Sequence, residues 1–434
     1  MIGEKRDHLP SLLLLPGPPE PASRASLSAA YRPPLEMALA RTKRTDKAAT
    51  LIVAVAASWL DGPSQETKEL VWPDMSALLA GLYTIIAVLC AKMDIATDMD
   101  GGPGSVDVRV VLLDHDRSRA FPDFLPIIEP NNTIVVDLPS FAAAYHPWND
   151  IFHVQSEAGL HLNNLYVKFA QTVQRIADDQ LVAVAGGLTM HLGPSATASG
   201  TSTPASRIMH LPTPSHACVC LGGTFDHLHP GHKLLLTAGA LLLRVPTPLS
   251  GPACEYVIGI TGDDMLRNKR YAAYVQPWDE RARNVIYFLA SLLELARDGW
   301  EEKIGPDIDE HTAGDFRASF RNGSITVQCV RIDDAYGPTT RRPDIGCLVV
   351  SGETRSGGRA VNQERAKLGW QLVDVFEVDV LTADEVATDM AAEDATATTA
   401  SFEAKISSTE IRRVKAEAAA KAKLTEEGKQ ASTS

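Results

Sequence analysis

Short apolar runs and longer helical periods alternate along the second half of this 434-residue chain. The short runs have the composition of strands that are buried on both faces of a parallel sheet. They lie at 217–221, 256–261, 325–330, 346–351 and 371–378. After Pro277 the apolar residues follow the offsets i, i+3, i+4, i+7 and i+8, which place them on one face of a helix. Further helices are expected from Gly231 and over 359–369. This alternation predicts an α/β fold with a doubly wound parallel sheet of Rossmann-like type.

The first half of the chain has a weaker pattern that also predicts an α/β domain, over residues 31–192. Residues 105–114 and 132–138 are expected to form strands, and 160–176 an amphipathic helix. The uncharged stretch 75–91 is at the lower limit of a membrane span, about 17–25 residues. Because no second stretch of this kind follows, we expect a helix buried in the domain. The sequence assigns no function to this half.

Composition sets the limits of the two predicted domains. Residues 1–30 are rich in Pro and Ser, and we expect them to be disordered. A linker of Ser, Thr, Gly and Pro is predicted at 193–215. The second domain then spans 216–420, with a mobile Thr-, Ala- and acid-rich insertion at 382–401. The charged residues 421–434 are expected to form a flexible tail.

Charge and cysteine content narrow the range of partners. A formal net charge of −13 argues against a general nucleic-acid binder, because such binding depends on Lys and Arg at the phosphates. It is compatible with a small basic pocket for a phosphorylated metabolite. The six cysteines lack zinc spacing, and we expect no metal site. Nothing in their arrangement indicates a disulfide scaffold, so we expect a reducing compartment, the cytoplasm.

The candidate chemistry is concentrated in GGTFDHLHPGH, between Gly222 and His232, where the first strand of the second domain crosses to a helix. Ligands of doubly wound sheets bind at such crossings. Gly222 and Gly223 let the backbone approach a ligand. His232 falls in the first helical turn, where free N–H groups attract anions, and His229 can converge on the same place. One such histidine is usually a surface or capping residue, but the pair with the glycines favours a phosphate site. The spacing matches neither the dinucleotide-binding motif nor a P-loop.

This segment resembles the H-x-G-H signature of the nucleotidyltransferase superfamily, and ISSTEIRR at 406–413 resembles its second signature, I-S-S-T-x-x-R. The stretches GITGDDMLRNKR, QPWDERARNVIYFL, DAYGPT and VVSGETRSGGRAVNQER resemble eukaryotic phosphopantetheine adenylyltransferases. The resemblance covers about 216–415, and the lack of a P-loop after it is similar to the monofunctional fungal arrangement. It implies adenylyl transfer from ATP to 4′-phosphopantetheine, which gives dephospho-CoA and pyrophosphate in coenzyme A synthesis. Mg²⁺ would arrive with ATP and keep most of its waters.

The resemblance also implies the residues of the site. His229, His232, Lys269 and Arg412 would be catalytic, and Thr224 and Lys269 would contact the acceptor phosphate. The residues implied to contact the nucleotide are Gly222, Gly223, Thr224, Phe225, Arg355, Arg359, Ser407, Ser408 and Thr409. A simple helix cap is the alternative role for the Ser-Ser-Thr run. No protein nucleophile is needed, since the acceptor phosphate attacks directly and the protein supplies alignment and charge.

Two other interpretations stay open at this point. Another enzyme of the superfamily would carry the same signatures and use nicotinamide mononucleotide, flavin mononucleotide or a cytidylyl acceptor. A non-catalytic nucleotide-binding scaffold that associates with other enzymes of coenzyme A synthesis would have the same fold. The two intact signatures favour an enzyme over a scaffold, and the intervening stretches favour phosphopantetheine as the acceptor.

Overall fold

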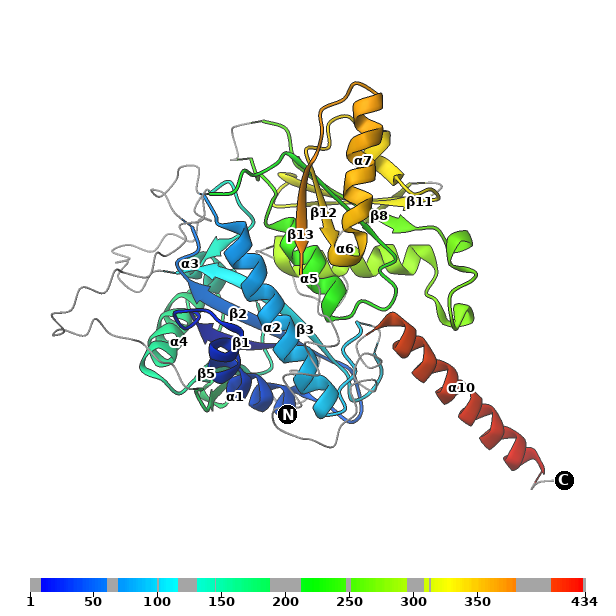
Figure 1. Cartoon of the computed structure of the whole chain (residues 1–434). Coiled ribbons are helices and arrows are strands. Elements are labelled where there is room, and N and C mark those ends of the chain that lie inside the picture. The colour runs from blue at the N-terminus through cyan, green and yellow to red at the C-terminus, as the bar shows by residue number, and fades with distance from the viewer. Residues whose placement is uncertain are drawn as a thin grey trace, which may run out of the picture.

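A computed structural model describes the parts of the chain that are discussed from here on. These are residues 9–60, 69–99, 101–115, 131–144, 146–187, 212–246, 251–294, 308–311, 314–379 and 407–431. They form two sheets, each with helices packed against it, and a C-terminal helix that projects from the rest of the chain (Figure 1). Most of the predicted linker and all of the predicted insertion at 382–401 lie outside the described residues.

The first sheet has six parallel strands in the order β4-β3-β2-β1-β5-β6. The strands are β1 Ser11–Pro16, β2 Ala49–Ala57, β3 Val106–Asp114, β4 Val136–Asp137, β5 Ile151–Val154 and β6 Leu181–Val184. The helices are α1 Arg24–Thr42, α2 Trp72–Lys92, α3 Leu138–Ala143 and α4 Glu157–Ala170, with a short 3₁₀ helix at Asp178–Gln180. Helices α1 and α2 pack together on one side of the sheet, and α3 and α4 on the other (Figure 1).

The prediction that residues 1–30 are disordered is wrong for β1 and for the start of α1. Leu12 to Leu15 are fully buried, and β1 pairs with β2 on one side and β5 on the other. Four successive leucines suit a strand that is covered on both faces. The strand predicted at 132–138 is shorter than expected, because Asp137 accepts a hydrogen bond from Ser140 N at 2.7 Å and caps α3.

The second sheet has seven strands in the order β13-β12-β7-β8-β11-β10-β9. They are β7 Cys218–Gly223, β8 Cys254–Thr261, β9 Ile308–His311, β10 Asp315–Phe320, β11 Ile325–Ile332, β12 Cys347–Ser351 and β13 Asp374–Val378. The five strands from β13 to β11 are parallel, as predicted. The sheet is not wholly parallel, since β9 and β10 add an antiparallel edge. The alternating residues of DFRASF form the strand β10 of that edge, which was not among the predicted strands.

Three helices cover the two faces of the second sheet: α5 Pro230–Ala240, α6 Trp278–Leu293 and α7 Arg355–Lys367. Helices α5 and α6 pack on one face, and α7 on the other. The strand residues divide in the same way, so that Val219 and Leu221 belong to the core under α5, and Cys218 and Cys220 to the core under α7. Short 3₁₀ helices lie at Asp263–Leu266, Ala272–Tyr274, Gly337–Thr340 and Gly352–Thr354.

Helix α2 covers the stretch that was weighed as a membrane span. Among the described helices it alone is long and apolar enough for one, and 67% of its apolar window is buried in the structure. It packs against α1, β3 and α5, and the Trp72 indole N–H donates to the Ala238 carbonyl at 2.8 Å. This burial is typical of a core helix. Residues of α2 and of both sheets belong to one hydrophobic core.

The C-terminal helix α10, Ser408–Ala431, begins beside the second sheet and extends away from it (Figure 1). It continues to Ala431, so the segment predicted to be a flexible tail beyond residue 420 is helical to that point. Only its first turns contact the rest of the described chain in a way that bears on the site below.

Candidate active site

The GGTFDHLHPGH loop leaves the carboxyl end of β7, which lies between β12 and β8. The registers pair Leu221 with Val349 and Gly223 with Ile260, so the carboxyl ends of the three strands meet at one edge. The chain runs from β7 to one side through β8 and β11, and later to the other side through β12 and β13. This is the topological switch point at which doubly wound sheets bind ligands.

The path of the loop is fixed by buried polar contacts. Phe225 and His227 have φ values of 52° and 47°, in the left-handed region that few non-glycine residues adopt. The buried Arg281 of α6 donates to the carbonyls of Thr224 at 2.7 Å and Gln276 at 2.9 Å. The Gln276 side chain in turn accepts from His227 N at 2.7 Å. These contacts hold a strained loop in one conformation.

The sequence analysis missed Arg281, although a signal for it exists. Arg281 lies four residues before Val285, on the apolar face of the helix predicted after Pro277. A charged residue in that position must find partners when it is buried. Burial lowers the pKa of Arg281, and the Asp263 carboxylate, at 2.6 Å, opposes this shift.

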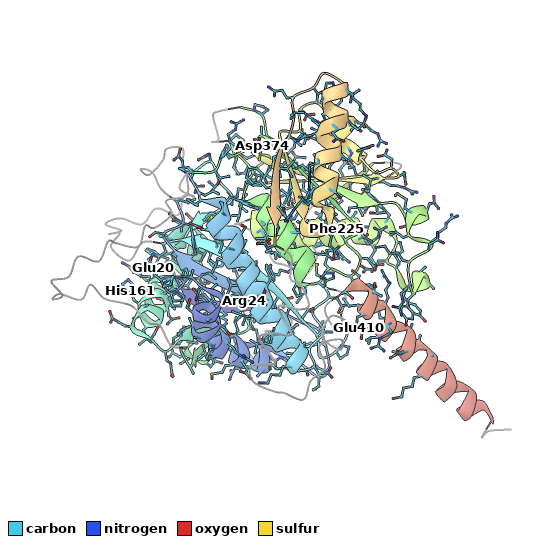
Figure 2. The ribbon with its side chains drawn as sticks, viewed as in Figure 1. Glu20, Arg24, His161, Phe225, Asp374 and Glu410 are labelled. Atoms are coloured by element: carbon cyan, nitrogen blue, oxygen red, sulfur yellow. The ribbon has the colours of Figure 1, made fainter. Side chains whose placement is uncertain are left out.

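His229 and His232 form a stacked pair at the beginning of α5. Their ring centroids lie 3.9 Å apart with an angle of 29° between the planes, and the Phe225 ring lies 5.4 Å from His232. His229 is the N-cap residue of α5, and His232 belongs to its first turn. The prediction that the two imidazoles converge at a helix N-terminus agrees with this geometry. Figure 2 labels Phe225, which marks the loop, and Glu410, which marks the first turn of α10.

Both imidazoles are held in the neutral form. Burial lowers the pKa of His229 to about 3, and the Lys233 charge adds to this effect. The pKa of His232 also lies well below its usual value, through burial first and then through His229 and Lys269. Within the described residues, the Nδ1 atoms of both rings are buried and have no hydrogen-bond partner. A neutral imidazole keeps one N–H group, so each ring can donate one hydrogen bond to a phosphate oxygen.

Lys269 reaches the same loop from the segment that follows β8. Its Nζ lies 3.2 Å from Thr224 Oγ1, so the two residues that were predicted to contact the acceptor phosphate lie together. Burial lowers the pKa of Lys269, and the nearby Arg412 charge lowers it further. An ammonium group with a depressed pKa, beside a hydroxyl, is suited to holding an anionic oxygen.

Arg412 meets the loop, but not as a free phosphate clamp. Its Nη1 donates to the Asp226 carboxylate at 2.6 Å, and both side chains are buried. Its Nε donates to the Arg270 carbonyl at 3.1 Å, and its Nη2 to Thr409 Oγ1 at 3.1 Å. In this structure the side chain fastens α10 to the imidazole loop, and the expected contact of Arg412 with phosphate stays a prediction.

The serines of the second signature also face the loop. Ser408 Oγ donates to the Asp226 carbonyl at 2.8 Å. Ser407 Oγ accepts from Glu410 N at 3.3 Å, which is the helix cap that was weighed as its alternative role. Arg413 pairs with Glu410 and Glu417. The two signatures thus meet at one edge of the sheet, and the N-termini of α5 and α10 lie at the same loop.

The two arginines that were predicted to contact the nucleotide lie elsewhere on this edge. Arg355 and Arg359 are exposed residues of α7, and Arg355 forms a two-pronged ion pair with Glu377 of β13. No direct contact joins either arginine to the imidazole pair among the described residues. Packing within the chain also favours glycine at position 223, because a Cβ there would lie 2.9 Å from the Phe225 ring.

A possible metal cluster at the opposite end of the strands is occupied by an arginine. Cys218, Glu255 and Asp344 bring ligand atoms within 4.8 Å of one another at the amino ends of β7, β8 and β12. Arg342 donates to Glu255 at 2.8 Å and also pairs with Asp344. The guanidinium lies against both carboxylates and balances one of their two charges, so the cluster by itself gives no argument for a metal.

Comparison with known proteins finds similarity over parts of the chain. Residues 3–190 match the model of a domain family of unknown function. A phosphopantetheine adenylyltransferase of Saccharomyces cerevisiae is 34% identical over 194 residues, which are 45% of this chain and 47% of that protein. An uncharacterised protein of Schizosaccharomyces pombe is 30% identical, over 37% of this chain and 39% of its own. The match thus spans less than half the length of these two relatives.

Archaeal proteins are matched more completely. A phosphopantetheine adenylyltransferase of Pyrococcus abyssi is 28% identical over 38% of this chain and 78% of its own length. Among solved structures, a protein of unknown function from Archaeoglobus fulgidus is 27% identical and is covered over 88% of its length and 37% of this chain, with a TM-score of 0.26. Under half of the chain is therefore similar to proteins named as adenylyltransferases.

Proposed function

We propose that this protein is a phosphopantetheine adenylyltransferase, which converts ATP and 4′-phosphopantetheine to dephospho-CoA and pyrophosphate. The observation that carries the proposal is the neutral His229–His232 stack at the N-terminus of α5, beside Lys269 and Thr224. Relatives in a yeast and in archaea that bear this name support the choice of acceptor. The relatives support the proposal only for the part of the chain that they match, 45% for the yeast protein.

The proposed reaction is a direct displacement at the α-phosphorus of ATP. A phosphate oxygen of the acceptor forms the new P–O bond, and the bond to pyrophosphate breaks. His229 and His232 donate hydrogen bonds to the α-phosphate oxygens as negative charge grows there, which is the kind of contact that lowers the barrier most. The acceptor is already ionised, so the imidazoles need not remove a proton. Their neutral state suits this role.

Lys269 and Thr224 are proposed to hold the acceptor phosphate against the reacting phosphorus. The N-terminus of α5 adds its free N–H groups and its dipole. Mg²⁺ is proposed to enter as part of the substrate Mg²⁺–ATP. The loop carboxylate Asp226 is bound by Arg412 and by Gln276 N, and is therefore not free to act as a metal ligand.

The test is pyrophosphate release by the purified full-length protein with Mg²⁺–ATP and a panel of acceptors. We expect turnover with 4′-phosphopantetheine, and much weaker turnover with nicotinamide mononucleotide or flavin mononucleotide. A panel with CTP and a phospho-alcohol covers the cytidylyl alternative. If another acceptor is preferred, the protein is still a nucleotidyltransferase, but 4′-phosphopantetheine is not its acceptor. Binding of ATP without turnover on any acceptor would instead favour a scaffold.

The cytoplasm is proposed as the compartment. All six cysteines are unpaired and buried, and a chain with this many free thiols is typical of a reducing environment. The test is to extract the protein in acid, which stops thiol exchange, and to count the thiols that react with a labelling reagent before and after unfolding. We expect six reactive thiols after unfolding without reductant.

A further inference from the structure

The N-terminal half contacts the helix that carries the imidazole pair. Lys233, the residue after His232, is fully buried and points its Nζ at Asp107 of β3, 2.6 Å away. The same Nζ donates to the Thr97 carbonyl at 2.9 Å. Asp107 is also buried, so this is an ion pair removed from water between the two halves of the chain. It lies one residue from a candidate catalytic side chain.

A second contact reaches the other signature segment. Lys415 of α10 lies three residues after Arg412, and its Nζ is 3.6 Å from the buried carboxylate of Asp98. It also lies 3.2 Å from His227 Nδ1, within the imidazole loop. An ammonium has only donors, so Nδ1 accepts and the ring Nε2–H donates to the Tyr274 carbonyl at 3.0 Å. Lys415 thus joins the N-terminal half, α10 and the loop.

The charges in this region keep the contact in place. Burial alone would raise the pKa of Asp107, but Arg109 and Lys233 lower it to about 2, so the carboxylate stays ionised. Arg109 also donates to the Tyr287 carbonyl of α6 at 3.2 Å. A buried ion pair of this kind adds little net stability compared with apolar packing, yet removing one partner is costly. Its geometry fixes the direction of the elements that it joins.

We propose that Asp98 and Asp107 are positioning residues for adenylyl transfer, which act through Lys415 and Lys233 to hold the N-termini of α10 and α5 at one loop. We call Thr97, Asp98 and Asp107 the N-terminal contact residues. This gives the N-terminal half a role in the chemistry of the other half, and it rests on the proposed function. Catalysis by alignment is sensitive to small displacements, since a shift of about 1 Å can cost a factor of about 10².

The test compares Asp107→Asn, Asp98→Asn and a control, Asp150→Asn, in the full-length protein. Asp150 pairs with Arg41 at 3.1 Å inside the N-terminal half, and in the structure this pair does not involve the second half. We expect kcat to fall about 10- to 100-fold for Asp107→Asn and about tenfold for Asp98→Asn. The KM for Mg²⁺–ATP should change much less, and the control should keep the wild-type kcat.

A second measurement does not depend on turnover. Hydrogen–deuterium exchange should become faster over 224–232 and 407–413 in both test variants, and should be unchanged there in Asp150→Asn. If the wild type transfers adenylyl to no acceptor, the proposed function fails and the exchange result still decides the positioning role. Should Asp107→Asn not fold, Asp98→Asn and Lys415→Met decide, because Lys415 is partly exposed. Kinetics and exchange equal to those of the control would overturn the proposal.

Discussion

The Arg412 guanidinium donates to the Asp226 carboxylate at 2.6 Å, and this buried pair joins two segments that are 186 positions apart in the chain. Asp226 lies in the loop that leads to the imidazole pair, and Arg412 lies in the first turns of α10. Ser408 adds a hydrogen bond to the carbonyl of the same Asp226. The ion pair and this hydrogen bond together hold the second signature against the first.

Loss of the Arg412 charge should destabilise the protein strongly. Arg412→Met leaves the Asp226 carboxylate buried without its partner, which costs about 3–5 kcal/mol of unfolding free energy. Urea denaturation checks this, with Arg267→Met as the control. Arg267 pairs with Asp264, and both side chains are exposed, so its removal should change the midpoint little. Equal effects of the two variants would contradict the assignment of Arg412 as the fastening residue.

Replacement of His232 should affect the chemical step more than substrate binding. His232→Ala removes the hydrogen-bond donor that we propose for the α-phosphate, and we expect kcat to fall roughly 10²–10³-fold. Pyrophosphate release at saturating Mg²⁺–ATP and 4′-phosphopantetheine measures this. His161→Ala, at an exposed position of α4, serves as the control. A rise in KM with an unchanged kcat would mean that His232 binds substrate and transition state equally.

The neutral imidazoles should make stability depend on pH. The pKa of His229 in the folded protein is about 3, whereas an unfolded histidine titrates near 6.5. Between these values the unfolded chain binds more protons, so the stabilisation present above pH 6.5 is lost as pH falls toward 3. The double variant His229→Asn/His232→Asn should therefore lose less unfolding free energy than the wild type when the pH is lowered from 7 to 5. Parallel curves for the two proteins would show that these histidines titrate normally.

Lys269 should limit activity at alkaline pH. Its charged form is the useful one, and its pKa lies below the usual 10.5, so activity should decline as pH rises through this lowered value. The profile of kcat/KM reports groups of the free enzyme. Lys269→Arg, whose charge persists at high pH, should remove this decline, while Lys269→Met should be weakly active at every pH. An alkaline limb that is the same in Lys269→Arg and the wild type would exclude Lys269 as its source.

The two arginines of α7 should contribute unequally to nucleotide binding. The fork of Arg355 is engaged by Glu377, whereas Arg359 is exposed on the same helix. Arg359→Ala should raise the KM for ATP about tenfold, the size expected for one charge-assisted hydrogen bond. Arg355→Ala should raise it less, because ATP would first have to displace Glu377. A larger effect at Arg355 would mean that this ion pair opens when nucleotide binds.

The sequence was sufficient for the features that depend on neighbours along the chain. Alternating apolar runs and helical periods predicted the parallel core of the second sheet, and the glycines and histidines predicted that two imidazoles meet at the N-terminus of a helix. The same local logic failed at β1, where a four-leucine run between prolines looked like the start of a disordered tail. That run becomes a strand only because β2 and β5 pair with it on either side.

Only the tertiary structure decided the protonation state of the site histidines and the contacts that hold the site residues in place. The signature motif names His229 and His232, but their neutral form comes from the side chains that bury them. The signature names Arg412, but only the fold shows that its guanidinium donates to Asp226. Asp107 gave no sequence signal, since its partner Lys233 lies 126 positions away. Strand order and loop path determine which distant charges meet, and no pattern of neighbouring residues contains that information.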